Sequence, residues 1–163
     1  MSNDQSLLEQ VADVLDRHGV EYIVVGGAAE NLMGSPRTTM DVDLCYRRTP
    51  TNLEALAAAL RELRVTLRGA PPGLPFIIDA RTLGHGLNFT FSCALGDLDM
   101  LGEIEPIGGF DALAVHAESF DRFRTISLDD LIRAKEHIKR PKDFESLLQL
   151  RAIRASRGKP GYQ

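Results

Sequence analysis

Residues 24–46 read VVGGAAENLMGSPRTTMDVDLCY, and they place two aspartates inside the second of two short apolar runs. In a strand, residues two apart point to the same face, so Asp41 and Asp43 project side by side while Val42 and Leu44 pack behind them. Two carboxylates that face one way in an apolar strand repel each other and resist burial. A divalent cation that prefers oxygen ligands, such as Mg²⁺, relieves this conflict. The alternative is an exposed edge strand whose acids face water.

A pair of glycines ends the first of these apolar runs. Gly26 and Gly27 open a short helix, where backbone N–H groups and the helix dipole favour a phosphate. Taken alone, the pair is better explained by a tight turn that admits only small residues. Thirteen residues separate Gly27 from Asp41. A strand, two glycines and a helix that are followed by Asp-x-Asp form a more specific pattern than the glycine pair or the aspartate pair alone. The combination indicates metal-assisted phosphate chemistry.

A third carboxylate comes from the later segment LGDLDMLGEI. Here Asp97 and Asp99 again stand two positions apart in an apolar strand. Gly96 marks the turn before this strand, which favours Asp97 as a turn residue. Asp99 lies deeper, between Leu98 and Met100, so we predict that Asp99 joins the first two aspartates in one site.

The composition bounds the class of protein. The chain has 163 residues, 44% hydrophobic and 26% charged, which suits one well-packed globular domain. No apolar run reaches the roughly 18–20 residues of a membrane span, and the polar start MSNDQSLLEQ is unlike a signal peptide. We therefore expect a cytoplasmic protein that makes no membrane contact. Cys45 and Cys93 are expected in the core as thiols, not in a disulfide.

The net charge of −4 is unevenly distributed along the chain. Residues 1–119 carry 8 basic and 17 acidic side chains, a net charge of −9, whereas residues 120–163 carry 11 and 6, a net charge of +5. A basic C-terminal part beside an acidic part could meet a polyanion across metals held by the acids. A solvated basic face is the alternative.

Hydrophobic periodicity and capping residues predict a mixed order of elements. Helices are expected at 5–18, 28–33, 51–63, 110–117, 127–138 and 141–155, and strands at 21–25, 41–46, 76–79, 87–95 and 97–101, with an extended stretch at 120–126. Thr51 and Glu54 form a capping-box pattern for the third helix. The expected fold class is α+β (α/β), a mixed sheet flanked by helices. We expect one domain over 1–163, with its core at about 20–126 and a helical segment at 127–157.

The spacing of these motifs resembles the nucleotidyltransferase superfamily that includes DNA polymerase beta. The signature of that superfamily is an apolar residue, two small residues, a gap of about a dozen residues and Asp-x-Asp, with a third acid from a neighbouring strand. More narrowly, the segments GDLDMLGEI, SLDDLIRAKEHIKRPKDFESLLQL and RTTMDVDL resemble small bacterial nucleotidyltransferase-like proteins related to the abortive-infection toxin group. The resemblance spans most of residues 20–150.

The resemblance implies a fold and an activity. Asp41 and Asp43 would hold two Mg²⁺ ions against a nucleoside triphosphate, and Asp99 would ligate the catalytic metal and help to deprotonate an acceptor hydroxyl. Gly26 and Gly27 would cradle the phosphates. A nucleoside monophosphate, for example from ATP, would pass to the acceptor as pyrophosphate leaves.

Three basic residues are further candidates for nucleotide binding. Lys135 matches a lysine common in the subgroup and follows an apolar helix face, so it either faces a phosphate or is a surface lysine. Lys142 lies between the last two expected helices, and Arg37 lies just before the aspartate strand. Arg37 either steadies a phosphate or only its own loop.

Several acceptors and partners are compatible with the sequence. The acceptor could be RNA such as a tRNA end, a protein or a small molecule, and only 6% of residues are aromatic, which disfavours a base-stacking platform. The chain leaves little room for an acceptor domain, so a homodimer, an antitoxin partner or a small acceptor would complete the site. The alternative function is a non-catalytic nucleotide sensor or partner subunit on the same fold.

Overall fold

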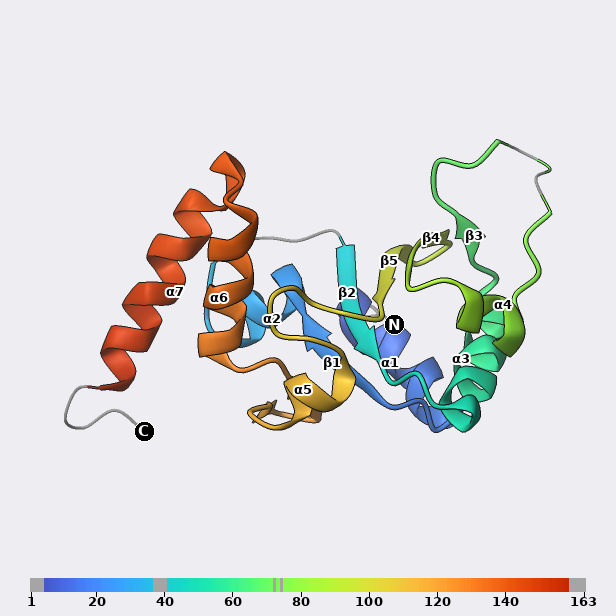
Figure 1. Cartoon of the computed structure of the whole chain (residues 1–163), viewed down its shortest axis with the longest axis horizontal. Helices are drawn as coiled ribbons and strands as arrows, with labels where there is room; N and C mark the ends of the chain where they lie inside the picture. Colours follow the sequence, from blue (N-terminus) through green and yellow to red (C-terminus); the bar gives the residue numbers. More distant parts are fainter. Residues whose placement is uncertain (1–4, 37–40, 72, 74, 159–163) are drawn as a thin grey trace.

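The computed structural model describes residues 5–36, 41–71, 73 and 75–158 (Figure 1). Its helices are α1 (Leu7–Arg17), α2 (Gly26–Leu32), α3 (Pro50–Leu63), α4 (Ala80–His85), α5 (Phe110–Ala114), α6 (Leu128–Ile138), the 3₁₀ helix η1 (Pro141–Asp143) and α7 (Phe144–Arg157). Its strands are β1 (Tyr22–Val25), β2 (Asp41–Tyr46), β3 (Thr66–Leu67), β4 (Asn88–Cys93), β5 (Gly96–Leu101), β6 (Glu118–Phe120) and β7 (Phe123–Thr125).

The strands of the described chain form one mixed sheet with the order β3-β4-β5-β2-β1-β7-β6. At its centre, β2 pairs antiparallel with β1 and parallel with β5. β1 also pairs parallel with β7, whereas β4 pairs antiparallel with β5. This confirms the predicted α+β architecture with a mixed sheet and a C-terminal helical segment.

The core lies between the sheet and the helices that cover it. α1 contacts both β2 and α3, and α6 and α7 pack against each other on the far side of α2 from these helices (Figure 1). Fully buried side chains include Leu15 of α1, Leu44 of β2, Leu56 of α3 and Ile132 of α6. Both cysteines are free thiols, as expected; Cys45 is buried in the core, whereas Cys93 is only partly buried against it.

Capping residues set the ends of several helices. Ser6 and Glu9 form a reciprocal capping box at the start of α1, and Ser127, the first residue of the helix predicted at 127–138, caps α6. The capping box predicted at Thr51 was wrong, because Thr49 accepts the N-cap hydrogen bond and Pro50 occupies the first turn of α3. None of the helices in the described ranges has the length and apolar character that crossing a membrane requires.

The predicted strand at 76–79 was also wrong. Asp79 is instead the N-cap of α4, a helix that the periodicity did not indicate. The carbonyl of Ile78 accepts a hydrogen bond from the Arg61 side chain at 2.6 Å, and Phe76 packs on Phe89 and Phe91. These side-chain contacts hold the segment in place of strand pairing.

Candidate active site

The paired aspartates of β2 lie beside the paired aspartates of β5. The parallel register places Asp41 opposite Asp97 and Asp43 opposite Asp99, while the intervening side chains are buried in the core. The four carboxylates therefore occupy one face of the sheet, which confirms the alternation predicted for each strand. The prediction that Asp97 is a turn residue was wrong, because β5 begins at Gly96 and includes Asp97.

The surroundings of Asp43 disfavour a negative charge. Burial is the largest cause, followed by repulsion from Asp99, a hydrogen bond with Asp99 and repulsion from Asp41, and together they raise the pKa of Asp43 to about 7 against the opposing charge of Arg68. Its Oδ1 is buried and accepts no hydrogen bond from the described residues. A cation that contacts the Asp43 carboxylate would therefore stabilise its ionised form.

Gly26 brings the start of α2 against Asp43. Its φ is +61°, a left-handed conformation, and a Cβ at this position would lie 2.2 Å from Oδ2 of Asp43. Both observations require glycine here. The first glycine of the pair therefore serves a close approach to the carboxylate, and Gly27 continues α2 as a partly buried residue.

Gly26→Ala is expected to disturb the site more than left-handed strain alone would. The new Cβ must push the Asp43 carboxylate away, so we expect a loss of about 2–3 kcal/mol of unfolding free energy. Gly19→Ala is the matched control, because Gly19 has a φ of +73° and no atom within 4 Å of the position that a Cβ would take. This control should lose about 1 kcal/mol. Urea unfolding measures both, and equal losses would contradict the close-approach argument.

Arg68 is a charged residue of the site that the sequence patterns did not single out. Its Nη2 donates to Oδ1 of Asp99 at 2.6 Å, and its Nη1 lies 3.4 Å from Oδ2 of Asp97. Asp97 also accepts a hydrogen bond from Ser92 at 2.8 Å. Arg68 directly follows the two residues of β3, too short a strand to show alternation, so no sequence signal marked it.

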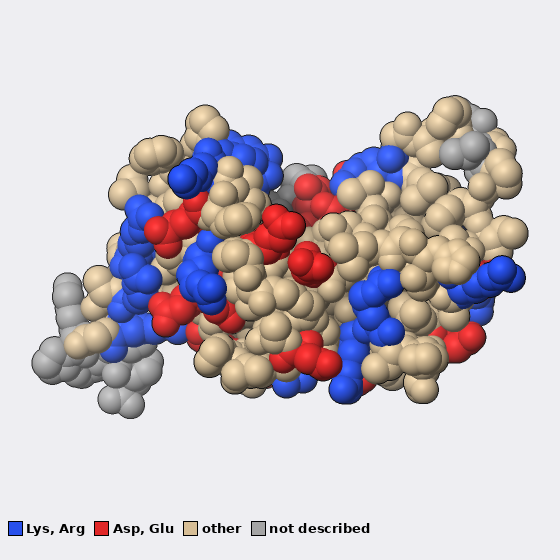
Figure 2. All heavy atoms as spheres, viewed as in Figure 1, with Lys and Arg blue, Asp and Glu red and all other residues tan. Residues whose placement is uncertain are grey.

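The carboxylate face is open to solvent between two basic margins. Figure 2 shows a hollow in the surface between the C-terminal helices and the β3–β4 side, with acidic side chains gathered in it and Lys or Arg on both flanks. Asp41 is exposed, whereas Asp43 and Asp99 are partly buried. An anionic ligand can therefore reach the hollow only if cations offset its acidic floor.

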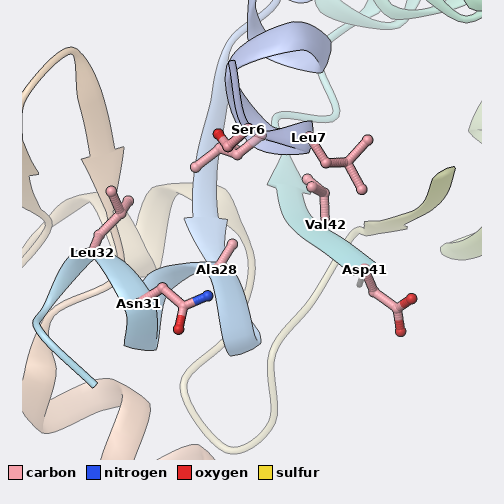
Figure 3. A pocket seen from close by; sticks show the side chains of 8 residues that line it. Ser6, Leu7, Ala28, Asn31, Leu32, Asp41 and Val42 are labelled. Carbon is pink, nitrogen blue, oxygen red and sulfur yellow. The ribbon is translucent and has the colours of Figure 1, made fainter. Parts of the chain in front are cut away.

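A separate pocket of about 260 Å³ lies behind β2, between the start of α1 and α2. Leu7, Ala28 and Val42 line it, and Asp41 stands at its rim with its carboxylate turned away from Leu7 and Ala28 (Figure 3). Val42 points to the opposite face from the carboxylates. This apolar pocket is therefore distinct from the acidic hollow.

Lys135 lies in a buried ionic network with Glu30 and Asp143. Its Nζ is 3.1 Å from Oε2 of Glu30 and 3.3 Å from Oδ1 of Asp143, and only 9% of its side chain is exposed. The surface-lysine alternative was wrong. Burial acts against the charge of Asp143, but the hydrogen bond from Arg140 and the charge of Lys135 together lower its pKa. The phosphate contact of Lys135 stays a prediction.

The other two predicted basic residues lie near the C-terminal helices or outside the described chain. Lys142 is exposed in η1 and lines a polar pocket of about 400 Å³ together with Pro36 and Gln149. Gln149 accepts a hydrogen bond from the Ser35 hydroxyl at 2.8 Å. Arg37 follows Pro36 but lies outside the described residues, so its predicted phosphate contact is not addressed by the structure.

The donor set of the acidic hollow suits a divalent cation. Asp41, Asp43 and Asp99 offer oxygen ligands, Oδ1 of Asp43 is a buried acceptor without a hydrogen bond from the described residues, and Gly26 leaves the space beside Oδ2 free of a side chain. Within the described ranges, no group of three or more His, Cys, Asp or Glu side chains is already gathered to hold a metal ion. Asp99 instead accepts a hydrogen bond from Arg68.

Comparison with known proteins identifies the fold. Neither the models of protein families nor the curated proteins match this sequence. Among solved structures, the lincosamide antibiotic adenylyltransferase LnuA, bound to lincomycin, is similar over 90% of this chain and 96% of that chain, with 16% identity and a TM-score of 0.61.

The antibiotic-resistance factor ANT(2'')-Ia is similar in two structures. Its solution structure aligns with 93% of this chain and 83% of that chain, with 14% identity and a TM-score of 0.58. Its crystal structure in complex with adenylyl-2''-tobramycin aligns with 91% and 93%, with 14% identity and a TM-score of 0.55. The chain therefore has the nucleotidyltransferase-like fold that the motif resemblance implied. The relation to the toxin group stays a prediction.

Proposed function

We propose that this chain is a Mg²⁺-dependent nucleotidyltransferase that moves a nucleoside monophosphate from a nucleoside triphosphate to an acceptor hydroxyl. The observation that carries the proposal is the pairing of Asp43 with Asp99 across β2 and β5, with Gly26 held against Asp43. The sequence motif that predicted these residues and the fold shared with nucleotidyltransferases support the same activity. Either support alone would leave the activity open.

Each residue of the site has a defined task in this proposal. Asp41, Asp43 and Asp99 supply the carboxylate oxygens that hold the metal, and Asp99 assists removal of the proton from the acceptor hydroxyl. Gly26 and Gly27 leave the backbone of α2 accessible to a phosphate. The bound Mg²⁺ ions would neutralise the triphosphate and stabilise both the attacking and the leaving oxygens. One bond forms between the acceptor oxygen and the α-phosphorus, and the bond to pyrophosphate breaks.

We further propose that the acceptor is a small hydroxylated molecule. LnuA is described in a lincomycin-bound form, and this chain covers 96% of it; ANT(2'')-Ia is described with adenylyl-2''-tobramycin. A chain of similar extent with the same fold therefore serves small acceptors in those proteins. The low aromatic content, 6%, also disfavours a base-stacking platform for extended RNA. Transfer to RNA or to a protein, including an action as a toxin, is tested alongside.

The test is transfer of label from each of four α-labelled nucleoside triphosphates in the presence of Mg²⁺. Separate mixtures contain a panel of amino sugars and lincosamides, total RNA, or a cell lysate, and Asp41→Asn is assayed in parallel. We expect label to move to a small acceptor with the wild type. The Asp41→Asn variant should lose this transfer by on the order of a thousandfold, because a metal ligand is removed.

The pattern of labelled products decides between the functions. Label on RNA or on a protein would overturn the small-acceptor proposal and retain the enzyme. Nucleotide binding without transfer in any mixture would replace the enzyme by the non-catalytic sensor, for which the hydrogen bond that Arg68 already donates to Asp99 is the favouring observation. Failure to bind any nucleotide in the presence of Mg²⁺ would overturn both functions.

A further inference from the structure

We propose that Arg68 is the internal counter-ion of the metal-free carboxylates and that a divalent cation must displace its guanidinium from Asp99. The proposal rests on the proposed function, because it takes Asp41, Asp43 and Asp99 as the metal ligands. Its consequence is that Arg68 weakens metal binding by the nucleotide-free protein. The guanidinium that stabilises the carboxylates without metal is thus also the group that the metal competes with.

The main chain holds Arg68 in line with the carboxylates. The Arg68 N–H donates to the carbonyl of Thr90 at 2.9 Å, which ties the residue to β4. Thr90 lies opposite Asp99 in β5, and Asp99 lies opposite Asp43 in β2. The four residues therefore follow one row across the sheet, and the Arg68 side chain extends past Thr90 to reach Asp99.

One strong hydrogen bond accounts for most of the attachment of the guanidinium. Nη2 is 2.6 Å from Oδ1 of Asp99, a short charge-assisted bond. Nη1 lies 3.4 Å from Asp97 Oδ2 and is buried without a hydrogen-bond acceptor among the described residues. About a third of the Arg68 side chain is exposed, 32%. The guanidinium can therefore move into solvent when the bond to Asp99 breaks.

Arg68 and a metal ion make opposing demands on Asp99. An oxygen that already accepts the guanidinium hydrogen bond is a weaker ligand for a cation, and the positive charges of the guanidinium and of a cation on the same carboxylate repel each other. Removing Arg68 should free Asp99 for the metal. It should also leave Asp97, Asp99 and Asp43 without this counter-ion when no metal is bound.

The test is titration of the nucleotide-free protein with Mn²⁺ by isothermal calorimetry. We expect Arg68→Gln to bind Mn²⁺ roughly tenfold more tightly than the wild type, because the charged hydrogen bond no longer has to be broken. Arg122→Gln is the matched control. Arg122 also pairs with two aspartates, Asp13 and Asp16, each at 2.7 Å, but it joins α1 to the β6–β7 turn, so its loss should leave Mn²⁺ affinity unchanged.

Thermal unfolding adds a second measurement that does not depend on catalysis. Arg68→Gln should lower the midpoint in EDTA and not in saturating Mn²⁺, whereas Arg122→Gln should lower both midpoints equally. If Arg68→Gln fails to fold, Arg68→Lys should bind Mn²⁺ with intermediate affinity, because a lysine lacks the planar fork of arginine.

The outcomes separate this inference from the proposed function. Unchanged or weaker Mn²⁺ binding by the Arg68 variants, with a wild type that binds, would overturn the inference, because Arg68 would then be neutral or would hold Asp99 in place for the metal. The enzyme proposal would stand in that case. A wild type that binds no Mn²⁺ with or without nucleotide would overturn both.

Discussion

Asp43→Asn is expected to abolish nucleotidyl transfer and, at the same time, to stabilise the metal-free protein. Transfer should fall by on the order of a thousandfold, because one of the proposed metal ligands is lost. The stabilisation follows from the raised pKa of Asp43, about 7, which reflects burial first and the neighbouring Asp99 second. Asparagine carries no charge into this site, so we expect a gain of about 3 kcal/mol at pH 8.

The pH dependence gives this prediction a clear sign. A carboxyl whose pKa is raised in the folded state is favourable when protonated, and this advantage is lost as the pH rises from about 4 to about 7. The gain of Asp43→Asn over the wild type should therefore be largest above pH 7 and shrink toward pH 4. Urea unfolding in EDTA at several pH values measures it.

Asp97→Asn is the matched control for this experiment. Asp97 lies on the same face but has a hydrogen bond from Ser92 at 2.8 Å and an ion pair with Arg68. Its replacement removes favourable contacts, so the variant should not gain stability at pH 8. An Asp43→Asn protein that is no more stable than the wild type at pH 8 would contradict the account of Asp43 as a destabilising buried charge.

The sequence was sufficient to predict β2, the strand that carries Asp41 and Asp43, and most elements of the fold. Strand alternation predicted that Asp41 and Asp43 share a face, and the boundaries of β2 agree with the prediction. The helices α1 and α6 were likewise predicted, because periodicity and a cap such as Ser127 are local signals. Local signals of this kind predict which side chains share a face, but not which strand lies beside them.

The features of the site that the sequence did not predict depend on pairing between segments that are distant in the chain. The register that sets Asp97 beside Asp41 arises from the pairing of β2 with β5, which no local pattern encodes. Arg68 reaches Asp99 only because Arg68 lies beside β4. The buried Glu30 offered a signal that was not used, since it is a lone acid among apolar residues of α2.

Lys135→Met is expected to be the most destabilising of the substitutions considered. The Lys135 ammonium lies between Glu30 and Asp143, whose side chains are each 1% exposed. Removing it leaves two buried carboxylates without their shared cation, so we expect a loss of about 3–5 kcal/mol of unfolding free energy. Denaturant unfolding at pH 7.5 measures this loss.

A double substitution distinguishes this structural task of Lys135 from a contact with nucleotide. Glu30→Gln in the Lys135→Met background replaces one uncompensated charge by a neutral side chain of similar size, so part of the lost stability should return and the two effects should not add. If Lys135 acts only through α2, α6 and η1, the recovered protein should bind nucleotide almost as the wild type does. Recovered stability with nucleotide binding still lost would instead support the predicted phosphate contact. A Lys135→Met protein as stable as the wild type would refute the buried network, because Glu30 and Asp143 would then not depend on the ammonium between them.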